Sequence, residues 1–301
     1  MVDDAREGLL VQRFESLPAN RLDALVSTRA GGYSTGPYAG LNLGLRVEDD
    51  DATVIRNREL LFEAYALALE RSVWCKQIHA DRVRIVGQAD IGRGSRSEGD
   101  VIVDTDALVT DLIGVPLVVT LADCVPVVLY DPVNHVVGLA HAGWGGTVRR
   151  ISSRTVAVMG ECYGTQPQEL IAAIGPSIAP DDYEVGETVI TQATHAYGAD
   201  AGRILRSAPA GRIQFDLWEA NAVDLEQAGL ARDQIEIAAV STAAALDTWY
   251  SYRVEGVTGR FVTALSLMPR GVARRQLQAR AAAPGRVQGA KRSDGRSRLL
   301  S

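Results

Sequence analysis

The chain has 301 residues, 47% of them hydrophobic and 23% charged, which is enough to bury a full hydrophobic core. Its net charge is −6, but residues 271–301 hold eight Lys or Arg and one Asp, so the first 270 residues carry −13. An acidic body with a basic end argues against a nucleic-acid-binding domain, whose basic patch would lie on the folded part.

The sequence also argues against a membrane or secreted protein. It has no run of about 18 apolar residues, the length that a transmembrane helix needs. The N-terminal residues M-V-D-D-A-R-E-G lack the basic and apolar regions of a secretory signal. Three cysteines in so long a chain form no disulfide framework. We therefore expect a cytoplasmic protein whose reduced thiols are available to bind metal.

Short apolar runs alternate with amphipathic segments from Leu9 to Pro269. From the first pattern we expect strands at 25–28, 73–78, 83–86, 117–121, 125–130, 136–140, 171–174, 235–240, 249–253 and 261–267. From the second we expect helices at 54–69, 147–162, 187–197 and 216–228. The turn sequence Asp131-Pro132-Val133-Asn134 joins two of the strands and predicts a hairpin over 125–140.

Local signals support these helix ends. Asp49, Asp50 and Asp51 suit the N-terminus of the first helix, and Gly164 and Gly229 suit the ends of two others.

Strand pairs linked by turns, without a repeated βαβ unit, predict an α+β fold in which mixed β-sheets are flanked by helices. We expect one catalytic domain over residues 1–270. The basic tail, 271–301, has few large apolar residues and is expected to be disordered.

The segment from Thr120 to Gly146 carries the clearest chemistry. Cys124 and His141 each stand at the end of an apolar run, and His79 closes a third run. Catalytic zinc takes three protein ligands of this kind, and it would deprotonate Cys124 and lower the pKa of a water that it binds. From the residues alone two other interpretations stay open. One is a Cys–His hydrolase with Cys124 as nucleophile and His141 as base, and the other is an inert buried cysteine with two core histidines.

The remaining cysteines and histidines suggest structural places. Cys75 and Cys162 are expected in the core, His135 at the surface after a turn, and His195 near the end of a helix. The turn from His141 to Gly146 exposes backbone N–H groups that could face an anion.

Several short motifs resemble those of one family. They occur in order between about residues 26 and 268 and read T-R-A-G-G-Y-S-T-G-P-Y, L-N-L-G, K-Q-I-H, T-L-A-D-C-V-P-V, A-H-A-G-W, I-G-P-S-I, Y-E-V-G and S-Y-R-V-E-G-V-T-G-R. This series resembles the YfiH-like family, also called the laccase-domain or multicopper polyphenol oxidoreductase family. The A-D-C-x-P-V and A-H-A-G-W blocks together are highly specific.

The resemblance implies mixed sheets flanked by helices and a Zn²⁺ site formed by His79, Cys124 and His141. It implies a zinc-dependent purine nucleoside phosphorylase that acts on adenosine, inosine and methylthioadenosine and also deaminates adenosine. Other family labels are polyphenol oxidase and peptidoglycan editing factor. A multicopper oxidase needs a histidine-rich trinuclear cluster, and this chain has four histidines. We therefore expect zinc, with copper the less favoured metal.

The matching motifs suggest roles for other residues. The candidate catalytic residues are Asp123, Cys124 and His141, and Asp123, next to Cys124 in the sequence, could carry a proton or support the ligands. Candidate substrate-binding residues are Arg29, Asn42, Lys76, Gln77 and Arg253. Arg260 is a further arginine that could either contact phosphate or hold a turn. The expected partners are purine nucleosides and phosphate, with no nucleic acid and no membrane, and the oligomeric state is left undetermined.

The chain departs from the family pattern at three places. Gly145 stands where an arginine is common, Asp181 and Asp182 stand where cysteines are frequent, and Ser241-Thr242 replaces a Cys-Thr pair. The metal ligands survive all three changes. The missing arginine removes a possible phosphate contact, which favours, as an alternative, a catalytically weak metal-binding protein of the editing type.

Overall fold

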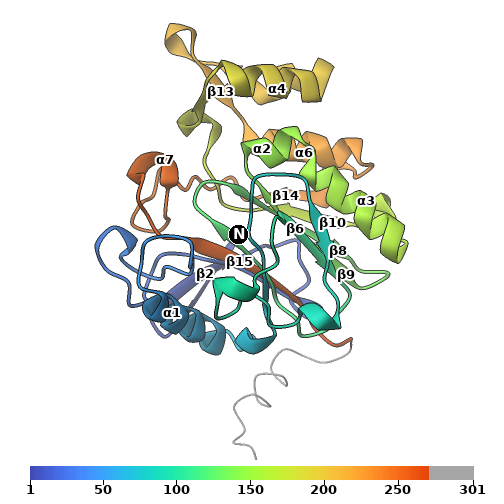
Figure 1. Cartoon of the computed structure of the whole chain (residues 1–301). Helices are drawn as coiled ribbons and strands as arrows, with labels where there is room; N and C mark the ends of the chain where they lie inside the picture. Colours follow the sequence, from blue (N-terminus) through green and yellow to red (C-terminus); the bar gives the residue numbers. More distant parts are fainter. Residues whose placement is uncertain (271–301) are drawn as a thin grey trace, which may run out of the picture.

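The computed structural model describes residues 1–270, and the expected basic tail, 271–301, lies outside them. Two six-stranded sheets stack face to face, and helices cover both outer faces (Figure 1). The first sheet has the order β1 (Val2–Arg6), β2 (Leu9–Arg13), β3 (Leu22–Ser27), β15 (Phe261–Leu267), β7 (Leu117–Leu121) and β4 (Val73–Trp74). The second has the order β14 (Ile235–Ile237), β10 (Ile171–Ile174), β8 (Val125–Asp131), β9 (Val136–Ala142), β6 (Ala107–Thr110) and β5 (Val83–Ile85).

Both sheets are mixed, as the sequence predicts. Most neighbouring strands are antiparallel, but β4 and β7, β5 and β6, and β10 and β14 pair in parallel. A small third sheet has the order β11 (Glu184–Val185), β13 (Ile213–Phe215) and β12 (Leu205–Ser207). The predicted α+β architecture of mixed sheets flanked by helices is therefore confirmed.

The helices form the outer layers of the molecule. They are α1 (Asp51–Ala64), α2 (Trp144–Val148), α3 (Ile151–Tyr163), α4 (Glu187–Tyr197), α5 (Ala201–Ile204), α6 (Leu217–Gln227) and α7 (Tyr252–Glu255). Short 3₁₀ turns are η1 (Gly36–Tyr38), η2 (Leu69–Arg71), η3 (Gln88–Asp90), η4 (Glu98–Asp100), η5 (Pro167–Glu169), η6 (Pro180–Asp182), η7 (Gly198–Asp200), η8 (Pro209–Gly211) and η9 (Arg232–Gln234). No helix within residues 1–270 is long and apolar enough to cross a membrane.

Three apolar layers hold these elements together. Between the two sheets lie side chains of β7 and β15 from one sheet and of β8 and β9 from the other. The outer face of the first sheet packs on α1, and the outer face of the second packs on α2, α3, α4 and α6. Alternation along β9 sets these layers, because Val137 and Leu139 point between the sheets while Val136 and Ala140 point to the helices. His141 shares the direction of Leu139.

The predicted hairpin is present as β8 and β9. Asp131 closes it by accepting hydrogen bonds from the backbone N–H groups of Val133 and Asn134, both at 2.9 Å. The register pairs Val128 with Leu139 and brings the start of β8 next to the end of β9. The hairpin therefore determines which residues meet at that edge of the sheet.

Helix ends follow their local sequence. The Asp50 side chain caps α1 by accepting from the Thr53 N–H, and α3 ends at Gly164, whose φ is +74°. The expected continuous helix over 147–162 is wrong, because Arg150 adopts φ +66° and separates α2 from α3. The expected helix over 54–69 starts earlier and ends at Ala64.

Other sequence-based expectations also need correction. The expected strand 249–253 is wrong, since Ser251 accepts a hydrogen bond from the Val254 N–H and starts the helical turn α7. The strands expected at 73–78 and 235–240 end at 74 and 237, while β1, β2, β6, β11, β12 and β13 were not predicted at all. Cys75 is buried as expected, but Cys162 is exposed in the last turn of α3.

His135 is buried rather than exposed. Its Nε2 lies 2.9 Å from the Met268 carbonyl oxygen, and its Nδ1 lies 3.2 Å from the Tyr130 hydroxyl. The turn that precedes it folds back on the end of β15, so these polar partners are reached inside the protein. A turn signal therefore does not place the next side chain at the surface.

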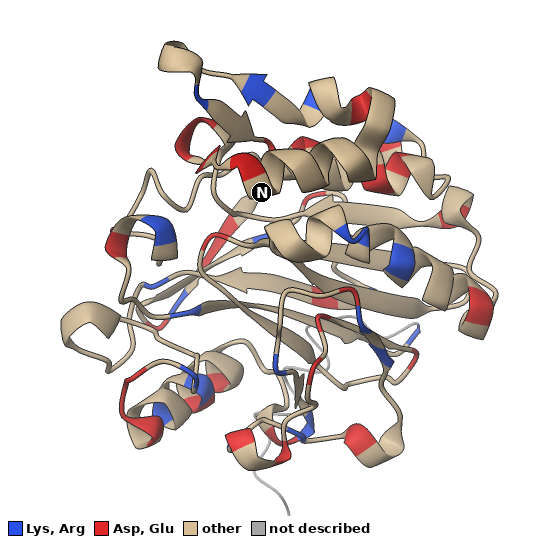
Figure 2. Cartoon of the chain, turned by 45° about the horizontal axis from the view of Figure 1, so that its top comes forward, with Lys and Arg blue, Asp and Glu red and all other residues tan. Residues whose placement is uncertain are grey.

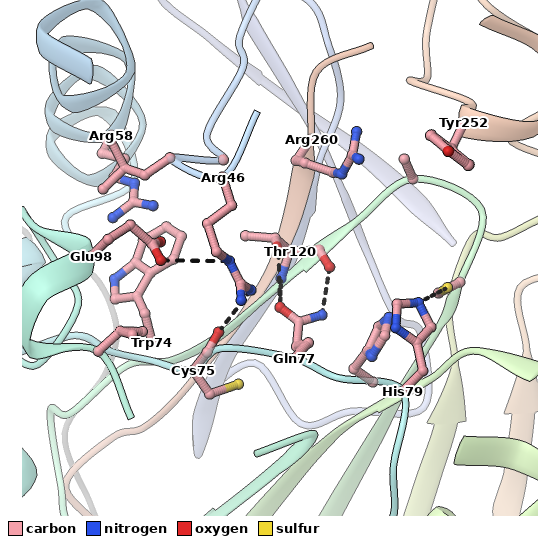
Figure 3. A pocket seen from close by; sticks show the side chains of 16 residues that line it. Arg46, Arg58, Trp74, Cys75, Gln77, His79, Glu98, Thr120, Tyr252 and Arg260 are labelled. Atoms are coloured by element: carbon pink, nitrogen blue, oxygen red, sulfur yellow. Dashed lines mark hydrogen bonds and ion pairs between the residues drawn. The ribbon is translucent and has the colours of Figure 1, made fainter. Parts of the chain in front are cut away.

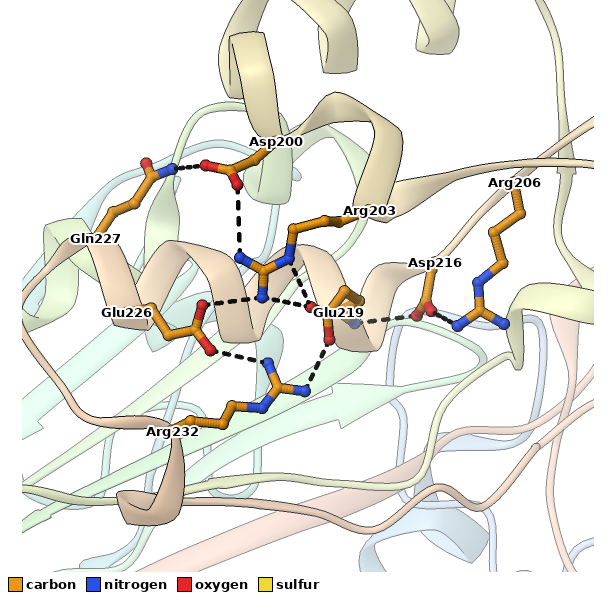
Figure 4. Close-up of polar contacts among 8 residues, drawn as sticks. All are labelled: Asp200, Arg203, Arg206, Asp216, Glu219, Glu226, Gln227 and Arg232. Atoms are coloured by element: carbon orange, nitrogen blue, oxygen red, sulfur yellow. Dashed lines mark hydrogen bonds and ion pairs between the residues drawn. The ribbon is translucent and has the colours of Figure 1, made fainter.

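The third sheet, α4 and α5 project from one end of the molecule and are joined to α6 by an ion-pair network (Figures 1 and 4). Arg203 of α5 pairs with Glu219 at 2.7 Å and with Glu226 at 3.0 Å. Arg232 pairs with the same two carboxylates from the other side, at 2.7 and 3.2 Å. A shared network is worth more than isolated surface pairs, so it fixes this projection on α6. Elsewhere basic and acidic residues are mixed over helices and loops (Figure 2).

Leu139→Ala tests the layer between the sheets. Leu139 is fully buried there, so the substitution should lower the free energy of unfolding by about 2–5 kcal/mol in a denaturant titration. Val103→Ala, at a position that is 62% exposed, should change it by less than about 0.5 kcal/mol. Equal effects of the two substitutions would contradict the assigned packing.

Candidate active site

Three sequence-predicted metal ligands meet at one edge of the sandwich. One atom of each of His79, Cys124 and His141 lies within 4.8 Å of the others. The Cys124 Sγ is 3.7 Å from the His79 Nε2, and the two imidazole rings have centroids 4.9 Å apart at an interplanar angle of 81°. Two imidazoles and one thiol around a common point are suited to bind a metal ion.

Strand pairing explains why residues so far apart in sequence meet. His79 follows β4 and Cys124 follows β7, and these two strands run in parallel, so their carboxyl ends lie at the same edge. The chain then crosses to the other sheet as β8, whose Pro126 pairs with His141 of β9. The hairpin register thus places His141 beside the crossing segment that carries Cys124.

A buried carboxylate that the sequence analysis missed holds two of the ligands. Asp106 is fully buried just before β6, and its carboxylate lies 3.0 Å from the His141 Nδ1. It also accepts hydrogen bonds from the backbone N–H groups of His79 and Ala80, each at 2.9 Å, and from that of Ile78. An ionised carboxylate only accepts, so Nδ1 of His141 carries the proton and Nε2 is left for a ligand. An Asp directly before the apolar run 107–110 is the signal that could have indicated it.

The charges in this cluster support one another. Burial acts to raise the pKa of Asp106, but the hydrogen bond from His141 and the backbone N–H groups bring it below its usual value. Burial likewise acts to raise the pKa of the Cys124 thiol, and His141 and His79 outweigh it and lower that pKa to about 6. Burial acts to lower the pKa of His141, whereas Cys124 and Asp106 raise it to about 9. The thiolate that a metal requires is therefore favoured before any metal binds.

Two residues at the site have left-handed backbone conformations, which cost energy outside glycine. The φ angles are +59° at His79 and +81° at Asp123. The Asp106 carboxylate stabilises the first turn. In the second, the Asp123 carboxylate accepts from the Thr242 hydroxyl at 2.7 Å and from the Arg253 N–H at 2.6 Å. Asp123 therefore connects the crossing segment to two distant loops.

Glycines after His141 allow the ligands to approach. A Cβ on Gly143 would lie 2.6 Å from the His79 Cδ2 and 2.9 Å from the Cys124 Sγ. A Cβ on Gly145 would lie 2.8 Å from the His79 carbonyl oxygen. Beside Gly145, the Arg149 guanidinium donates to the Gly145 carbonyl at 2.8 Å. Position 145 thus lacks room for the arginine that the family pattern has there.

The ligand cluster forms one end of a cavity of about 500 Å³ between the sheets and the N-terminal loops (Figure 3). His79 is exposed to it, whereas His141 is buried behind. The lining comprises Gly44, Leu45, Arg46, Arg58, Trp74, Cys75, Gln77, His79, Glu98, Val101, Thr120, Ala122, Cys124, His141, Tyr252 and Arg260. It combines a metal-ligand set with three arginines and one glutamate.

Two of the five predicted substrate-binding residues belong to this cavity or its support. Gln77 lines it, and its amide is fixed by Thr120, which donates its backbone N–H at 3.1 Å and accepts at 2.8 Å. Asn42 is buried behind the wall, where its Oδ1 accepts from the backbone N–H groups of Gly44 and Arg260.

The other three predicted residues do not line the cavity. Lys76 is exposed and does not line the cavity. The Arg29 guanidinium lies 4.5 Å from the Tyr250 ring and pairs with Glu255 at 3.0 Å. The Arg253 guanidinium lies 4.6 Å from the Tyr183 ring and donates to a backbone carbonyl. These two arginines hold loops in place, and the cavity instead receives Arg46, Arg58 and Arg260.

Comparisons with known proteins agree with this architecture. A family model described as "Multi-copper polyphenol oxidoreductase laccase" matches residues 23–268. The purine nucleoside phosphorylase YlmD of Bacillus subtilis is 35% identical over 262 residues, covering 86% of this chain and 94% of the relative. A purine nucleoside phosphorylase of Deinococcus radiodurans is 40% identical over 242 residues, covering 80% and 87%.

Solved structures show the same fold. The crystal structure of YlmD from Geobacillus stearothermophilus superposes with a TM-score of 0.84 at 32% identity, covering 88% of this chain and 98% of that one. The Bacillus licheniformis hypothetical protein YfiH gives a TM-score of 0.80 at 33% identity, covering 82% and 92%.

Gly143→Ala tests the close approach of the ligands. The added methyl group would overlap His79 and Cys124, so we expect zinc affinity to fall by at least about tenfold in a competition titration with a chelator, with little change in far-UV circular dichroism. Gly186→Ala is the matched control, because no atom lies within 4 Å of its added Cβ. Unchanged zinc affinity in Gly143→Ala would contradict the ligand geometry.

Asp106→Asn tests the carboxylate behind the ligands. The asparagine oxygen would accept hydrogen bonds less strongly than the carboxylate. The asparagine NH₂ group would face N–H groups that donate to Asp106 in the wild type, so His79 and His141 should lose their orientation. Zinc affinity should fall by about 10- to 100-fold, measured by the same competition titration. Wild-type affinity in this variant would show that the ligands orient themselves without Asp106.

Proposed function

This chain belongs to the multi-copper polyphenol oxidoreductase laccase family, and we propose that it is a metal-dependent purine nucleoside phosphorylase. The observation that carries the proposal is the group of His79, Cys124 and His141 at one end of a cavity large enough for a nucleoside. Relatives that align over most of their length and are named purine nucleoside phosphorylases support it.

We propose zinc as the metal. Two imidazoles, a thiolate of lowered pKa and a carboxylate that orients His141 are a donor set typical of zinc sites with an open position. When bound, zinc would supply a Lewis acid that stabilises negative charge on a substrate oxygen.

A multicopper oxidase centre lacks its ligands here. All four histidines of the chain lie within the described residues. His135 is bonded inside the protein to Tyr130 and Met268, and His195 is exposed on α4. Only His79 and His141 are left for metal, which is too few for a trinuclear cluster.

In the proposed reaction, hydrogenphosphate attacks the ribose of adenosine, inosine or methylthioadenosine. A phosphate oxygen forms the new bond to C1′ while the bond from C1′ to the purine N9 breaks, and its electron pair leaves with the base. The proton of hydrogenphosphate ends on the purine, so the products are the free base and ribose 1-phosphate, or 5-methylthioribose 1-phosphate from methylthioadenosine. Adenosine deamination, in which water replaces the 6-amino group and ammonia leaves, is proposed as a second activity of the same cavity.

The protein's own residues hold this site in place. Asp106 orients His141 and the His79 turn, Asp123 anchors the segment that carries Cys124, and Gln77 presents a fixed amide to the cavity. We propose that residues 1–270 act as one catalytic domain. Because all three cysteines are unpaired, we also propose that it works in the reducing cytoplasm, on small molecules rather than nucleic acid.

The test combines metal analysis with product analysis. Purified protein should contain about one zinc per chain and should convert adenosine plus phosphate to adenine and ribose 1-phosphate. Cys124→Ser and His79→Ala should lose both zinc and at least about 10³-fold in turnover, since the metal's contribution is several kcal/mol. Cys162→Ser, at an exposed cysteine on α3, should retain both. Turnover that is fully retained without metal would disprove the proposal.

A second candidate function rests on the thiol itself. The Cys124 pKa of about 6, which His141 and His79 lower, also suits a Cys–His hydrolase with Cys124 as nucleophile and His141 as base. Such an enzyme would keep its activity after chelation and lose it on alkylation with iodoacetamide. Zinc-loaded protein that releases neither adenine nor inosine would instead indicate a metal-binding protein of the editing type.

A further inference from the structure

The three arginines of the cavity differ in what surrounds their charge. Arg58 is buried and donates to the carbonyl oxygens of Leu43, Gly94 and Ser95, so its hydrogen-bonding capacity is directed into the wall. Arg46 makes an ion pair with Glu98 at 3.6 Å and donates to a backbone carbonyl (Figure 3). Both are thus engaged in holding the cavity together.

Within residues 1–270, Arg260 has two guanidinium nitrogens without a polar partner, whereas Arg46 and Arg58 each have one. Its Nη1 donates to the carbonyl oxygens of Thr258 and Gly259, at 2.8 and 2.9 Å. Within residues 1–270 no carboxylate lies within ion-pair distance of it, and its Nε and Nη2 have no hydrogen-bond acceptor. Neither atom is buried without a partner. Arg260 lines the cavity, where its guanidinium carbon lies 5.8 Å from the centre of the Tyr252 ring, which lines the cavity too.

The position of Arg260 is fixed before any ligand binds. Its backbone N–H donates to the Asn42 Oδ1 at 2.8 Å, and its carbonyl accepts from the Leu43 N–H at 2.9 Å. Its side-chain stem packs on Gly44, where a Cβ would lie 2.7 Å from the Arg260 Cγ. Asn42 is itself held by Asp49 at 2.8 Å. A guanidinium fixed in this way loses little freedom when it binds an anion.

We infer that Arg260 is the residue that binds the phosphate co-substrate, with Asn42 as the residue that positions it. The inference rests on the proposed function. Figure 3 shows Arg260 above Thr120 and between Arg46 and Tyr252, on the wall of the cavity that also contains His79. Two free N–H groups of a planar guanidinium match two phosphate oxygens. A phosphate held there has its third oxygen available for C1′ of a nucleoside in the same cavity.

This assignment differs from that suggested by sequence motifs. Arg29 and Arg253 have their guanidinium groups on tyrosine rings and on loop acceptors, outside the cavity lining. The inference therefore makes opposite predictions for Arg253 and Arg260, which a pair of substitutions can separate.

The experiment measures phosphate binding directly, without turnover. Zinc-loaded protein is titrated with inorganic phosphate by calorimetry, in the absence of nucleoside. Arg260→Gln should weaken phosphate binding by about 10- to 100-fold, the value of a charge-assisted hydrogen-bonded contact, with zinc content unchanged. Arg253→Gln and the exposed control Arg154→Gln should bind phosphate as the wild type does. In steady-state assays the KM for phosphate should rise in Arg260→Gln while that for adenosine stays within about threefold.

The outcomes separate this inference from the proposed function. Phosphate affinity that is unchanged in Arg260→Gln, or lost in Arg253→Gln instead, overturns the assignment even if phosphorolysis is observed. Phosphate binding that depends on Arg260 in a protein that forms no ribose 1-phosphate supports the assignment and refutes the phosphorylase. If Arg260→Gln does not fold, Arg260→Lys keeps the stem and charge but lacks the planar fork, and it should bind phosphate more weakly than wild type.

Discussion

The site depends on a single buried carboxylate. Asp106 lies just before β6, and its hydrogen bonds connect the turn that contains His79 to the strand that contains His141. Because it is fully buried, its carboxylate must be satisfied by hydrogen bonds, and it obtains them from the backbone of the His79 turn and from one imidazole nitrogen. The same bonds stabilise the left-handed backbone of His79 and select the tautomer of His141. The hydrogen bonds of Asp106 therefore contribute both to the stability of the fold and to the orientation of the ligands.

The rest of the site follows from bringing two sheets together at that edge. The crossing from β7 to β8 carries Cys124 from one sheet to the other, and the hairpin register returns His141 beside it. Such proximity leaves no space for side chains on the adjoining turn, which is why position 143 requires glycine. Elsewhere on the cavity wall, Asn42 and Leu43 hold the backbone of Arg260 through hydrogen bonds. The Arg260 guanidinium and the proposed metal ligands therefore line one cavity although they come from separate parts of the fold.

Much of this arrangement could be predicted from the sequence, and the limits have physical causes. Short apolar runs predicted β7, β8, β9, β10 and β15, because strands that are buried on both faces have nearly continuous apolar sequences. The break between α2 and α3 was missed, since the left-handed Arg150 interrupts a stretch whose apolar spacing continues across it. His135 and Cys162 were misplaced because a local pattern does not show which distant segments cover a residue. The end of β15 covers His135, whereas Cys162 is exposed although it lies on the apolar stripe of its helix.

The sequence by itself indicated which residues are chemically reactive. It contains two histidines and a cysteine at the ends of apolar runs, a donor set that suits a metal and also a Cys–His hydrolase, and the family resemblance favoured the metal. Tertiary structure alone decided which other groups join them. Arg29 and Arg260 lie in loops, Arg253 lies in α7, and all three carry the same charge. Arg29 and Arg253 contact tyrosines outside the cavity lining, whereas Arg260 lines the cavity beside Tyr252. The direction of a long side chain depends on what it packs against, and those contacts come from segments about 200 residues apart, such as Asn42 and Arg260.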